Sequence, residues 1–237
     1  MSISTTLANT HLFSTSSNFT ASTVPFSISV WINAVWNGGS RLSFVGMYNG
    51  TTTGGTSTGL QIGTSTGAGE VSCWTYGGTV MVQSTAGAMT AYNNTWANIT
   101  YTYNGTTHLV YINGVQAGSA TTAQNAGTFT QVWINGYPPT GNNNECAVFG
   151  VDSYIYYNRT LTANEALTIY NSTGMRHGIL NGQLTRYEFD ELAQGSAVTS
   201  VTDLSGNGNN LSVVGGGTSF TYNYATSFAD SNLRAPI

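Results

Sequence analysis

Acidic residues come first in a search for catalysis, because a retaining glycoside hydrolase needs two carboxylates about 5–5.5 Å apart. Residues two apart in a β-strand lie on the same face. Glu188 and Asp190 have this spacing, but Leu192 takes the next position on that face and Glu191 points away from it. The other candidate acids stand alone in the sequence: Glu145, Asp152 and Glu165. We therefore predict that the protein is not an enzyme and has no catalytic residues.

Histidine and cysteine give no metal-binding pattern either. His11, His108, His177, Cys73 and Cys146 occur singly, without the short spacings that zinc ligands share. Cys73 lies in an alternating segment and is expected to be a small buried residue, while His108 is expected to be a hydrogen-bonded strand residue. No phosphate-binding or dinucleotide-binding fingerprint is found. These observations predict no metal site at these residues and no cofactor.

The charge of the chain excludes two classes of partner. Only 6% of the 237 residues are charged, against about 25% in ordinary soluble domains, and the net charge is −4. Lysine is absent, and the five positive residues are scattered: Arg41, Arg159, Arg176, Arg186 and Arg234. Nucleic-acid binding needs a clustered basic surface, and a membrane helix needs roughly 18 consecutive apolar residues. Neither pattern is present, so we expect no nucleic-acid and no membrane partner.

The elements that would position any site are β-strands. Apolar residues alternate with polar ones at 26–32, a period of two that predicts a strand. Two Asn-Gly pairs, at 104–105 and 113–114, predict tight hairpin turns and a three-stranded meander over 96–118. Further strands are predicted near 42–48, 59–63, 70–76, 79–84, 131–135 and 147–157. Many short strands at this spacing predict a sandwich or a barrel.

One helix is predicted, near 162–171. Thr162 and Glu165 have the spacing of a capping box, in which each side chain bonds the other's backbone N–H. Apolar residues at 166, 167, 169 and 170 give the helix a buried side, and Gly174 follows as a stop.

Three segments in order resemble the laminin-G-like, concanavalin A-like family. They are the strand at 26–32 (FSISVWI), the meander that starts at Trp96 and contains LVYINGV at 109–115, and DSYIYYNRTLTANE at 152–165. The resemblance implies an all-β, concanavalin A-like jelly-roll β-sandwich of two antiparallel sheets with one short helix. Laminarinase-like enzymes of this architecture carry Glu-x-Asp-x-Glu on one strand, and here Leu192 replaces the third acid.

The C-terminal part has an unusual order. YEFDE at 187–191 and DLSGNGN at 203–209 resemble the segment that often precedes the first strand in this family, yet here they come last. We therefore divide the chain into a laminin-G-like sandwich, 1–175, and a C-terminal β extension, 176–237, that completes the same sandwich in permuted order. The alternative is an arm that packs on a neighbouring subunit.

Calcium is the one metal that the resemblance suggests, because some members of the family bind it. Asp203, Asn207 and Asn209 could supply oxygen ligands. The alternative, which we favour, is a turn stabilised by the Asp and Asn side chains without an ion.

Sugar binding is also suggested by the resemblance, since lectin sites combine an aromatic platform with amide or carboxylate groups. Loop segments of that composition contain Trp36, Asn37, Tyr137, Asn142 and Asn143. We predict these five residues as the ligand-binding set.

The function that we predict first is a non-enzymatic virion structural protein. It would be a phage capsid decoration, cement or fibre-type subunit, with glycan adhesion as an additional expectation. The chain shows no signal peptide, its uncharged surface suits contacts between copies, and phage structural proteins resemble its Tyr-Asn-Arg-x-Leu-Thr element. We expect synthesis in the host cytoplasm and a place on the virion surface. The alternative is a free or cell-surface lectin-like carbohydrate-binding module.

The predicted partners follow from the aromatic content. The chain has 14 Tyr and 5 Trp, and the alternation sends Trp31 to the face opposite Phe26, Ile28 and Val30. Interface cores are rich in aromatic residues and poor in charge. We therefore expect a homo-oligomer, or copies docked on major capsid or tail proteins, with host surface glycans as further partners.

Overall fold

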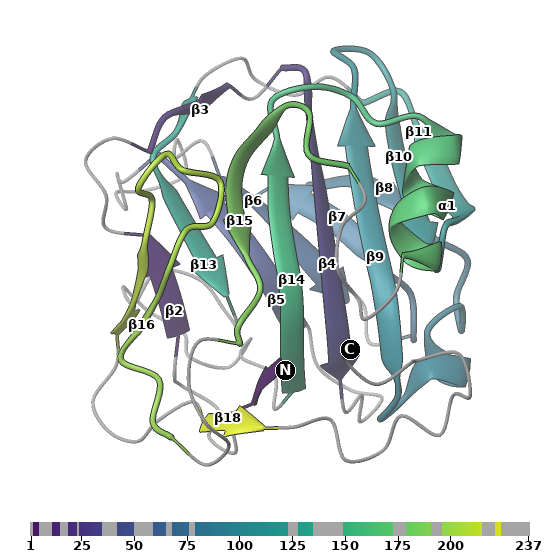
Figure 1. Ribbon diagram of the computed structural model, residues 1–237. Helices are drawn as coiled ribbons and strands as arrows, with labels where there is room; N and C mark the ends of the chain where they lie inside the picture. Colours follow the sequence, from purple (N-terminus) through teal and green to yellow (C-terminus); the bar gives the residue numbers. More distant parts are fainter. Residues whose placement is uncertain are drawn as a thin grey trace.

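The chain forms two large antiparallel β-sheets that pack face to face (Figure 1). In the part of the chain that the structure describes, one α-helix lies on the outside of this sandwich. The computed structural model describes residues 2–4, 11–14, 19–22, 24–34, 42–49, 59–64, 68–75, 79–122, 128–134, 149–172, 179–190, 196–214 and 221–223. The predicted jelly-roll β-sandwich of two antiparallel sheets with a short helix is confirmed.

Sheet A has eight strands within the described residues. In order across the sheet they are β11 (Val115–Ala120), β10 (His108–Ile112), β9 (Trp96–Tyr103), β4 (Phe26–Ala34), β14 (Phe149–Tyr157), β1 (Ser2–Ser4) and β18 (Thr221–Asn223). The eighth strand, β15 (Gln183–Tyr187), also pairs with β14.

Sheet B has eight strands within the same residues. Their order is β16 (Ser200–Val201), β17 (Leu211–Val214), β2 (His11–Ser14), β13 (Gln131–Ile134), β5 (Leu42–Tyr48), β6 (Gly59–Thr64), β7 (Ser72–Thr75) and β8 (Val80–Gln83). A two-stranded ribbon is made by β3 (Ala21–Ser22) and β12 (Thr128–Phe129). The strands predicted from the alternation therefore all form, with ends close to the predicted ones.

The core lies between the sheets and follows the alternation of β4. Phe26, Ile28, Val30 and Ile32 are fully buried and point inward. Phe26 stacks on the Tyr156 ring, with 5.5 Å between the ring centroids and 2° between their planes. The apolar period of two thus becomes one buried face of a sheet, where burial of each such side chain contributes about 1.5–3 kcal/mol.

The outer face of sheet A is also partly buried, because helix α1 (Ala163–Asn171) lies on it (Figure 1). A second small core forms there from Ile155, Tyr157, Leu161 and Ile169. Ser27 is buried on this face, where its Oγ donates to the Arg159 carbonyl and accepts from the Leu161 N–H, at 2.9 Å each. A small hydroxyl satisfies both backbone groups without bringing a charge into the interior. Ser27 thus shows how a buried strand position can hold an uncharged polar residue.

The hairpin turns differ from each other. Asn113 and Gly114 both have positive φ, 52° and 76°, as the predicted tight turn between β10 and β11 requires. At the other pair only Gly105 has positive φ, and β10 begins later, at His108. There the Asn104 side chain accepts hydrogen bonds from the backbone N–H groups at positions 106 and 107, which supports a longer loop. The tight-turn prediction for 104–105 is therefore wrong.

Helix α1 begins with the predicted capping box. Thr162 Oγ1 accepts from the Glu165 N–H at 3.2 Å, and Glu165 Oε2 accepts from the Thr162 N–H at 2.8 Å. Arg159 Nη2 donates to Glu165 Oε1 at 2.7 Å. This hydrogen bond is the main cause that lowers the pKa of Glu165 to about 2. The helix ends at Asn171, and the predicted stop at Gly174 lies outside the described residues.

Strands from the C-terminal part join both sheets. β15 pairs with β14 in sheet A, and β17 pairs with β2 in sheet B. Five apolar side chains from this part are at most 3% exposed in the shared core: Tyr187, Phe189, Val198, Val201 and Leu211. The strands on either side of residue 175 thus build the same two sheets. The boundary at 175 and the permuted order stay predictions.

His108 is a satisfied strand residue, as predicted. Its Nε2 lies 2.6 Å from the carbonyl oxygen of Thr122, which can only accept, so Nε2 carries the proton. Nδ1 then accepts from the Tyr101 hydroxyl, also at 2.6 Å. The predicted burial of Cys73 is confirmed as well, and this burial raises the pKa of its thiol. Burial lowers the pKa of His108, so the folded protein holds the neutral ring.

This neutral ring predicts a loss of stability in mild acid. The folded-state pKa lies below the ordinary value of about 6.5, so the unfolded chain takes up the proton more readily. The free energy of unfolding should therefore fall as the pH drops from about 6.5 toward the lowered pKa. Melting temperatures between about pH 7.5 and pH 5 would measure this fall. A His108→Gln variant should have a lower melting temperature at pH 7.5 but a flatter profile. Parallel profiles for the two proteins would contradict the prediction.

Candidate functional site

The five residues predicted as the ligand-binding set cannot be placed. Trp36 and Asn37 follow the end of β4, and Tyr137, Asn142 and Asn143 follow the end of β13. All five lie outside the described residues, so this set stays a prediction.

The Asp203 side chain stabilises a turn by accepting backbone hydrogen bonds. Its Oδ1 accepts from the backbone N–H groups of Arg186 and Ser205, both at 2.9 Å, and its Oδ2 accepts from that of Asn209 at 3.0 Å. The side-chain amides of Asn207 and Asn209 both donate to the carbonyl oxygen at position 184. This geometry is the turn that we favoured over a calcium site. Among the described residues no group of three His, Cys, Asp or Glu side chains could hold a metal ion.

Glu188 and Asp190 do not form the shared face that the sequence suggests. β15 ends at Tyr187, and Phe189 has a φ of 50°, which breaks the extended backbone between the two acids. Glu188 instead faces Arg186, with 3.6 Å between Oε1 and Nε. The assumption that a strand carries both carboxylates is therefore wrong. The left-handed conformation of a phenylalanine could not be read from the sequence.

The outer face of sheet B has aromatic residues that a ligand cannot reach. Tyr48, Trp74 and Trp133 are 2%, 0% and 3% exposed. Glycine at position 59 lets the Tyr48 ring approach the sheet, since a Cβ there would come within 2.7 Å of the ring. A Cβ at Gly63 would collide with the Leu42 carbonyl oxygen and would meet the Trp74 ring at 3.0 Å. Among the described residues, these three buried rings therefore give a ligand no exposed aromatic surface on this face.

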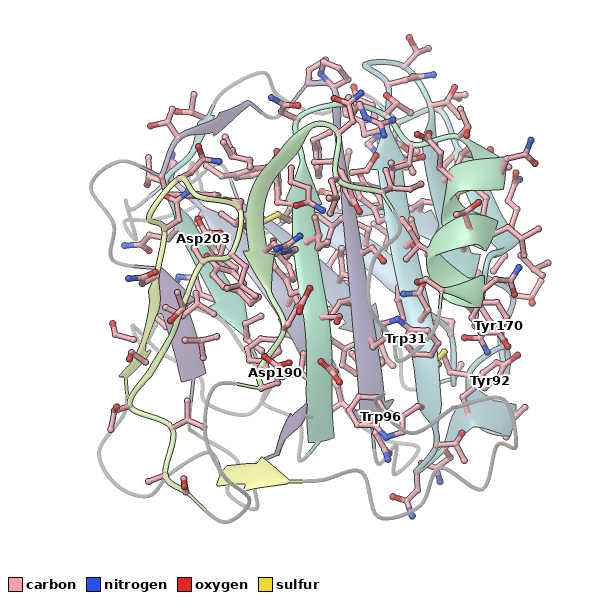
Figure 2. All side chains as sticks on the ribbon, viewed as in Figure 1. Trp31, Tyr92, Trp96, Tyr170, Asp190 and Asp203 are labelled. Carbon is pink, nitrogen blue, oxygen red and sulfur yellow. The ribbon has the colours of Figure 1, made fainter. Side chains whose placement is uncertain are left out.

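The outer face of sheet A, beside helix α1, has a more accessible group of aromatic and polar residues. The pairing of β9, β4 and β14 places two rows of side chains side by side on this face. One row contains Asn98, Trp31 and Asp152, and the other contains Trp96, Asn33 and Gly150. We call Trp31, Asn33, Trp96, Asp152 and the helix residue Tyr170 the sheet A patch. Figure 2 shows Trp31 and Tyr170 near the end of α1 and Trp96 further down the same sheet, with Asp190 on the other side of β14.

Three aromatic side chains form the apolar part of the sheet A patch. Tyr170 of α1 stacks on Trp31, with 5.8 Å between the ring centroids and 25° between the planes. The Trp96 indole reaches across Asn33, since a Cβ at Gly150 would lie 3.1 and 3.2 Å from its Cη2 and Cζ2 atoms. Glycine at position 150 therefore lets the indole lie low over the sheet. Trp31 is covered, at 7% exposed, whereas Trp96 remains partly exposed.

The polar part of the sheet A patch contains two groups without partners. Trp31 Nε1 and Asn33 Oδ1 are both buried, and neither atom has a hydrogen-bond partner. They are neighbours on one face of one strand, because the residues are two apart. Asn98, beside Trp31 in the same row, differs from them: its Nδ2 donates to Ser29 Oγ at 3.1 Å, and its Oδ1 accepts from Thr100 at 3.0 Å.

A β-bulge positions the last member of the sheet A patch. Asp152 pairs with Trp31 and Ile155 pairs with Ser29, so β14 contains one extra residue between them. Ser153 in the bulge has a φ of 48°, a strained value for a residue with a side chain. Bulges often redirect side chains near functional sites. Here the Asp152 carboxylate is held on the patch and is 2% exposed.

The sheet A patch brings together groups that a ligand could use, and its described residues show no catalytic arrangement. It combines a partly exposed indole, one unpaired donor, one unpaired acceptor and one carboxylate. A few fixed polar groups around aromatic rings are typical of small-molecule binding sites. The alternation along β4 directs Trp31 to the outer face, as predicted, but the ring is not exposed there, because Tyr170 covers it. The other members were missed, since they come from separate elements.

Comparison with known families identifies the superfamily of the chain. The sequence model of the concanavalin A-like lectin/glucanases superfamily matches residues 7–166. A search of curated proteins found no match.

Solved structures share the fold at low sequence identity. A putative carbohydrate-binding protein from Bacteroides ovatus matches with a TM-score of 0.61 and 15% identity, over 90% of this chain and 59% of its own. A heptameric SAP-like pentraxin from Limulus polyphemus has a TM-score of 0.56 and 11% identity, over 94% and 95%. A Ruminococcus gnavus IT-sialidase CBM40 bound to α2,3-sialyllactose has a TM-score of 0.50 and 13% identity, over 62% and 83%.

Larger proteins also match over part of their length. The chain spans only 22% of a Trypanosoma rangeli sialidase, with a TM-score of 0.48. At these identities the likenesses show the fold alone.

Proposed function

Because the chain belongs to the concanavalin A-like lectin/glucanases superfamily, we propose that it is a non-catalytic, lectin-like carbohydrate-binding module. We place its ligand on the sheet A patch. One observation carries this proposal: Trp31 Nε1 and Asn33 Oδ1 are buried without partners, beside the partly exposed Trp96.

Trp31 Nε1 and Asn33 Oδ1 each lack a hydrogen bond. A buried polar group without a partner costs about 1–3 kcal/mol. Both atoms are covered in this structure, so a ligand reaches them only when the rings over them move aside. A sugar hydroxyl could then both accept from Trp31 Nε1–H and donate to Asn33 Oδ1, and a bound sugar would remove both costs. The C–H face of a sugar ring can pack on the exposed side of the Trp96 indole, as apolar surfaces pack on aromatic rings.

The comparisons support this proposal more than the virion role. Two of the structural neighbours are described as carbohydrate-binding or as bound to a sugar. The virion surface location, the capsid or tail partners and the homo-oligomer stay predictions from the sequence. Mass spectrometry of purified virions and sedimentation of the isolated protein would test them.

The non-enzymatic role is supported by the position of the acids. Glu188 is tied to Arg186, and Asp190 follows the left-handed Phe189 instead of continuing a strand. On the sheet A patch, Asp152 is the carboxylate that the described residues supply.

An Asn33→Leu variant tests whether the unpaired Asn33 Oδ1 binds the ligand. Its glycan affinity and its stability are expected to change in opposite directions. Leucine has a similar size but lacks the unpaired acceptor. We expect affinity for any glycan found on an array to fall at least about tenfold, which is about 1.4 kcal/mol. The melting temperature should stay the same or rise, because an unsatisfied buried group is removed. Calorimetry and thermal unfolding would measure the two effects.

Asn98→Leu is the matched control, since Asn98 lies on the same face but has its hydrogen bonds made. This variant should lower the melting temperature. If Asn33→Leu also lowered it and left glycan binding unchanged, Asn33 would be a structural residue and the proposal would fail.

A further inference from the structure

We propose that the ligand of the sheet A patch is an uncharged glycan, and that the site discriminates against sialylated and other anionic sugars. This inference rests on the proposed carbohydrate-binding function and adds the chemical class of the ligand. It follows from which hydrogen-bonding groups are unpaired and from where the arginines are engaged.

The unpaired groups suit a hydroxyl better than a carboxylate. Trp31 Nε1–H can only donate, and Asn33 Oδ1 can only accept. An ionised carboxylate also only accepts, so it could satisfy Trp31 but would face Asn33 Oδ1 with two oxygens that have no proton to share. A hydroxyl has both a proton and lone pairs. A hydroxyl placed between the two atoms therefore satisfies both of them, whereas a carboxylate or sulfate in the same place satisfies at most one.

Asp152 strengthens this preference, because it places a carboxylate on the same face. It lies opposite Trp31 in the register of β14 and β4. A second carboxylate brought close to an existing one is disfavoured by repulsion between like charges.

The two described arginines each form an ion pair with an acid. Recognition of an anionic group usually relies on a charged donor such as the arginine fork. Arg159 Nη2 lies 2.7 Å from Glu165 Oε1, and Arg186 Nε lies 3.6 Å from Glu188 Oε1. In the part of the chain that the structure describes, these are the arginines present, and both pair with an acid. Neither belongs to the sheet A patch.

The fold itself leaves the charge of the ligand open. The Ruminococcus gnavus IT-sialidase CBM40 with this fold is bound to α2,3-sialyllactose, which carries a carboxylate. At 13% identity the fold is shared but the residues are not. The groups on the sheet A patch therefore decide which ligand is accepted here.

Paired glycans provide the test. The full-length protein is applied to an array on which sialylated and sulfated glycans stand beside their uncharged parents, with α2,3-sialyllactose beside lactose as one pair. We expect the bound glycans to be uncharged, and a sialic acid or sulfate added to a bound glycan to lower its affinity at least tenfold. Binding of the neutral form should change little with salt, because no ion pair forms.

An Asn33→Asp variant separates the acceptor from its charge. It keeps an acceptor oxygen at this position and adds a negative charge. Neutral glycans should still bind within a few-fold of wild type, while binding of any sialylated partner should fall further. Loss of neutral binding in this variant would contradict the role of Asn33 as a simple acceptor.

The failures of the two proposals can be told apart. If the best-bound glycan carries a carboxylate or a sulfate, the inference about charge is overturned and the carbohydrate-binding function stands. If the protein binds no glycan on the array, the proposed function itself is overturned, and the inference falls with it.

Discussion

A chain truncated after Gly174 is expected to aggregate instead of folding. The truncation removes β15, which pairs with β14, and β17, which pairs with β2. It also removes five core side chains that are at most 3% exposed: Tyr187, Phe189, Val198, Val201 and Leu211. Burial of one large apolar side chain contributes about 1.5–3 kcal/mol. Together these losses are comparable with the entire stability of a typical domain, about 5–15 kcal/mol.

The remaining protein would also expose strand edges. Without β17, the backbone groups of β2 that now pair with it become free to bind another chain. Soluble yield, size-exclusion chromatography and thermal unfolding would measure the outcome. A chain that ends at Asn223 keeps every described strand and serves as the control. A truncated protein that stayed soluble and unfolded cooperatively would show that the C-terminal part is a detachable arm.

A Trp96→Ala variant is expected to lose most of the glycan affinity. Partly exposed tryptophans beside buried polar groups often dominate binding, and such positions cost at least about 2 kcal/mol when truncated, or roughly 30-fold in affinity. Trp96→Phe keeps a ring over Gly150 and should lose less. The stability of both variants should change modestly, because Trp96 lies on the outer face and not in the core between the sheets.

The loop residues predicted from the sequence are the competing candidate for the glycan site. A double variant, Trp36→Ala with Tyr137→Ala, removes the aromatic residues of the loop set. We expect it to bind glycans like the wild type. If this double variant lost binding while Trp96→Ala retained it, the ligand would bind at the loop set and the sheet A patch would be a structural feature.

The permuted order and the domain boundary at 175 rest on the sequence resemblance, while the strand pairing across that boundary comes from the structure. The truncation tests whether the part after this boundary is needed for folding, because it ends the chain at nearly that position. The glycan tests are independent of it, since the members of the sheet A patch precede residue 175.

Local patterns in the sequence determined the strands, the turn at Asn113–Gly114 and the start of the helix. An alternating apolar strand, a positive φ at an Asn-Gly pair and a capping box each depend on residues a few positions apart. The same locality explains one error: Phe189 adopts a left-handed conformation that no local pattern predicted, so the expected face of Glu188 and Asp190 was lost. The sequence also excluded a basic surface, because charge is a property of composition.

Tertiary structure alone decided the candidate site. Trp31 and Asn33 share a strand, and their outward direction follows from the alternation, but whether their polar atoms have partners depends on what lies opposite. Trp96 reaches Asn33 only through the register of β9 with β4, and the bulge in β14 places Asp152 beside Trp31. Tyr170 covers Trp31 because α1 folds back onto the outer face of sheet A. Register and packing join residues more than a hundred positions apart, and neither is encoded by spacing along the chain.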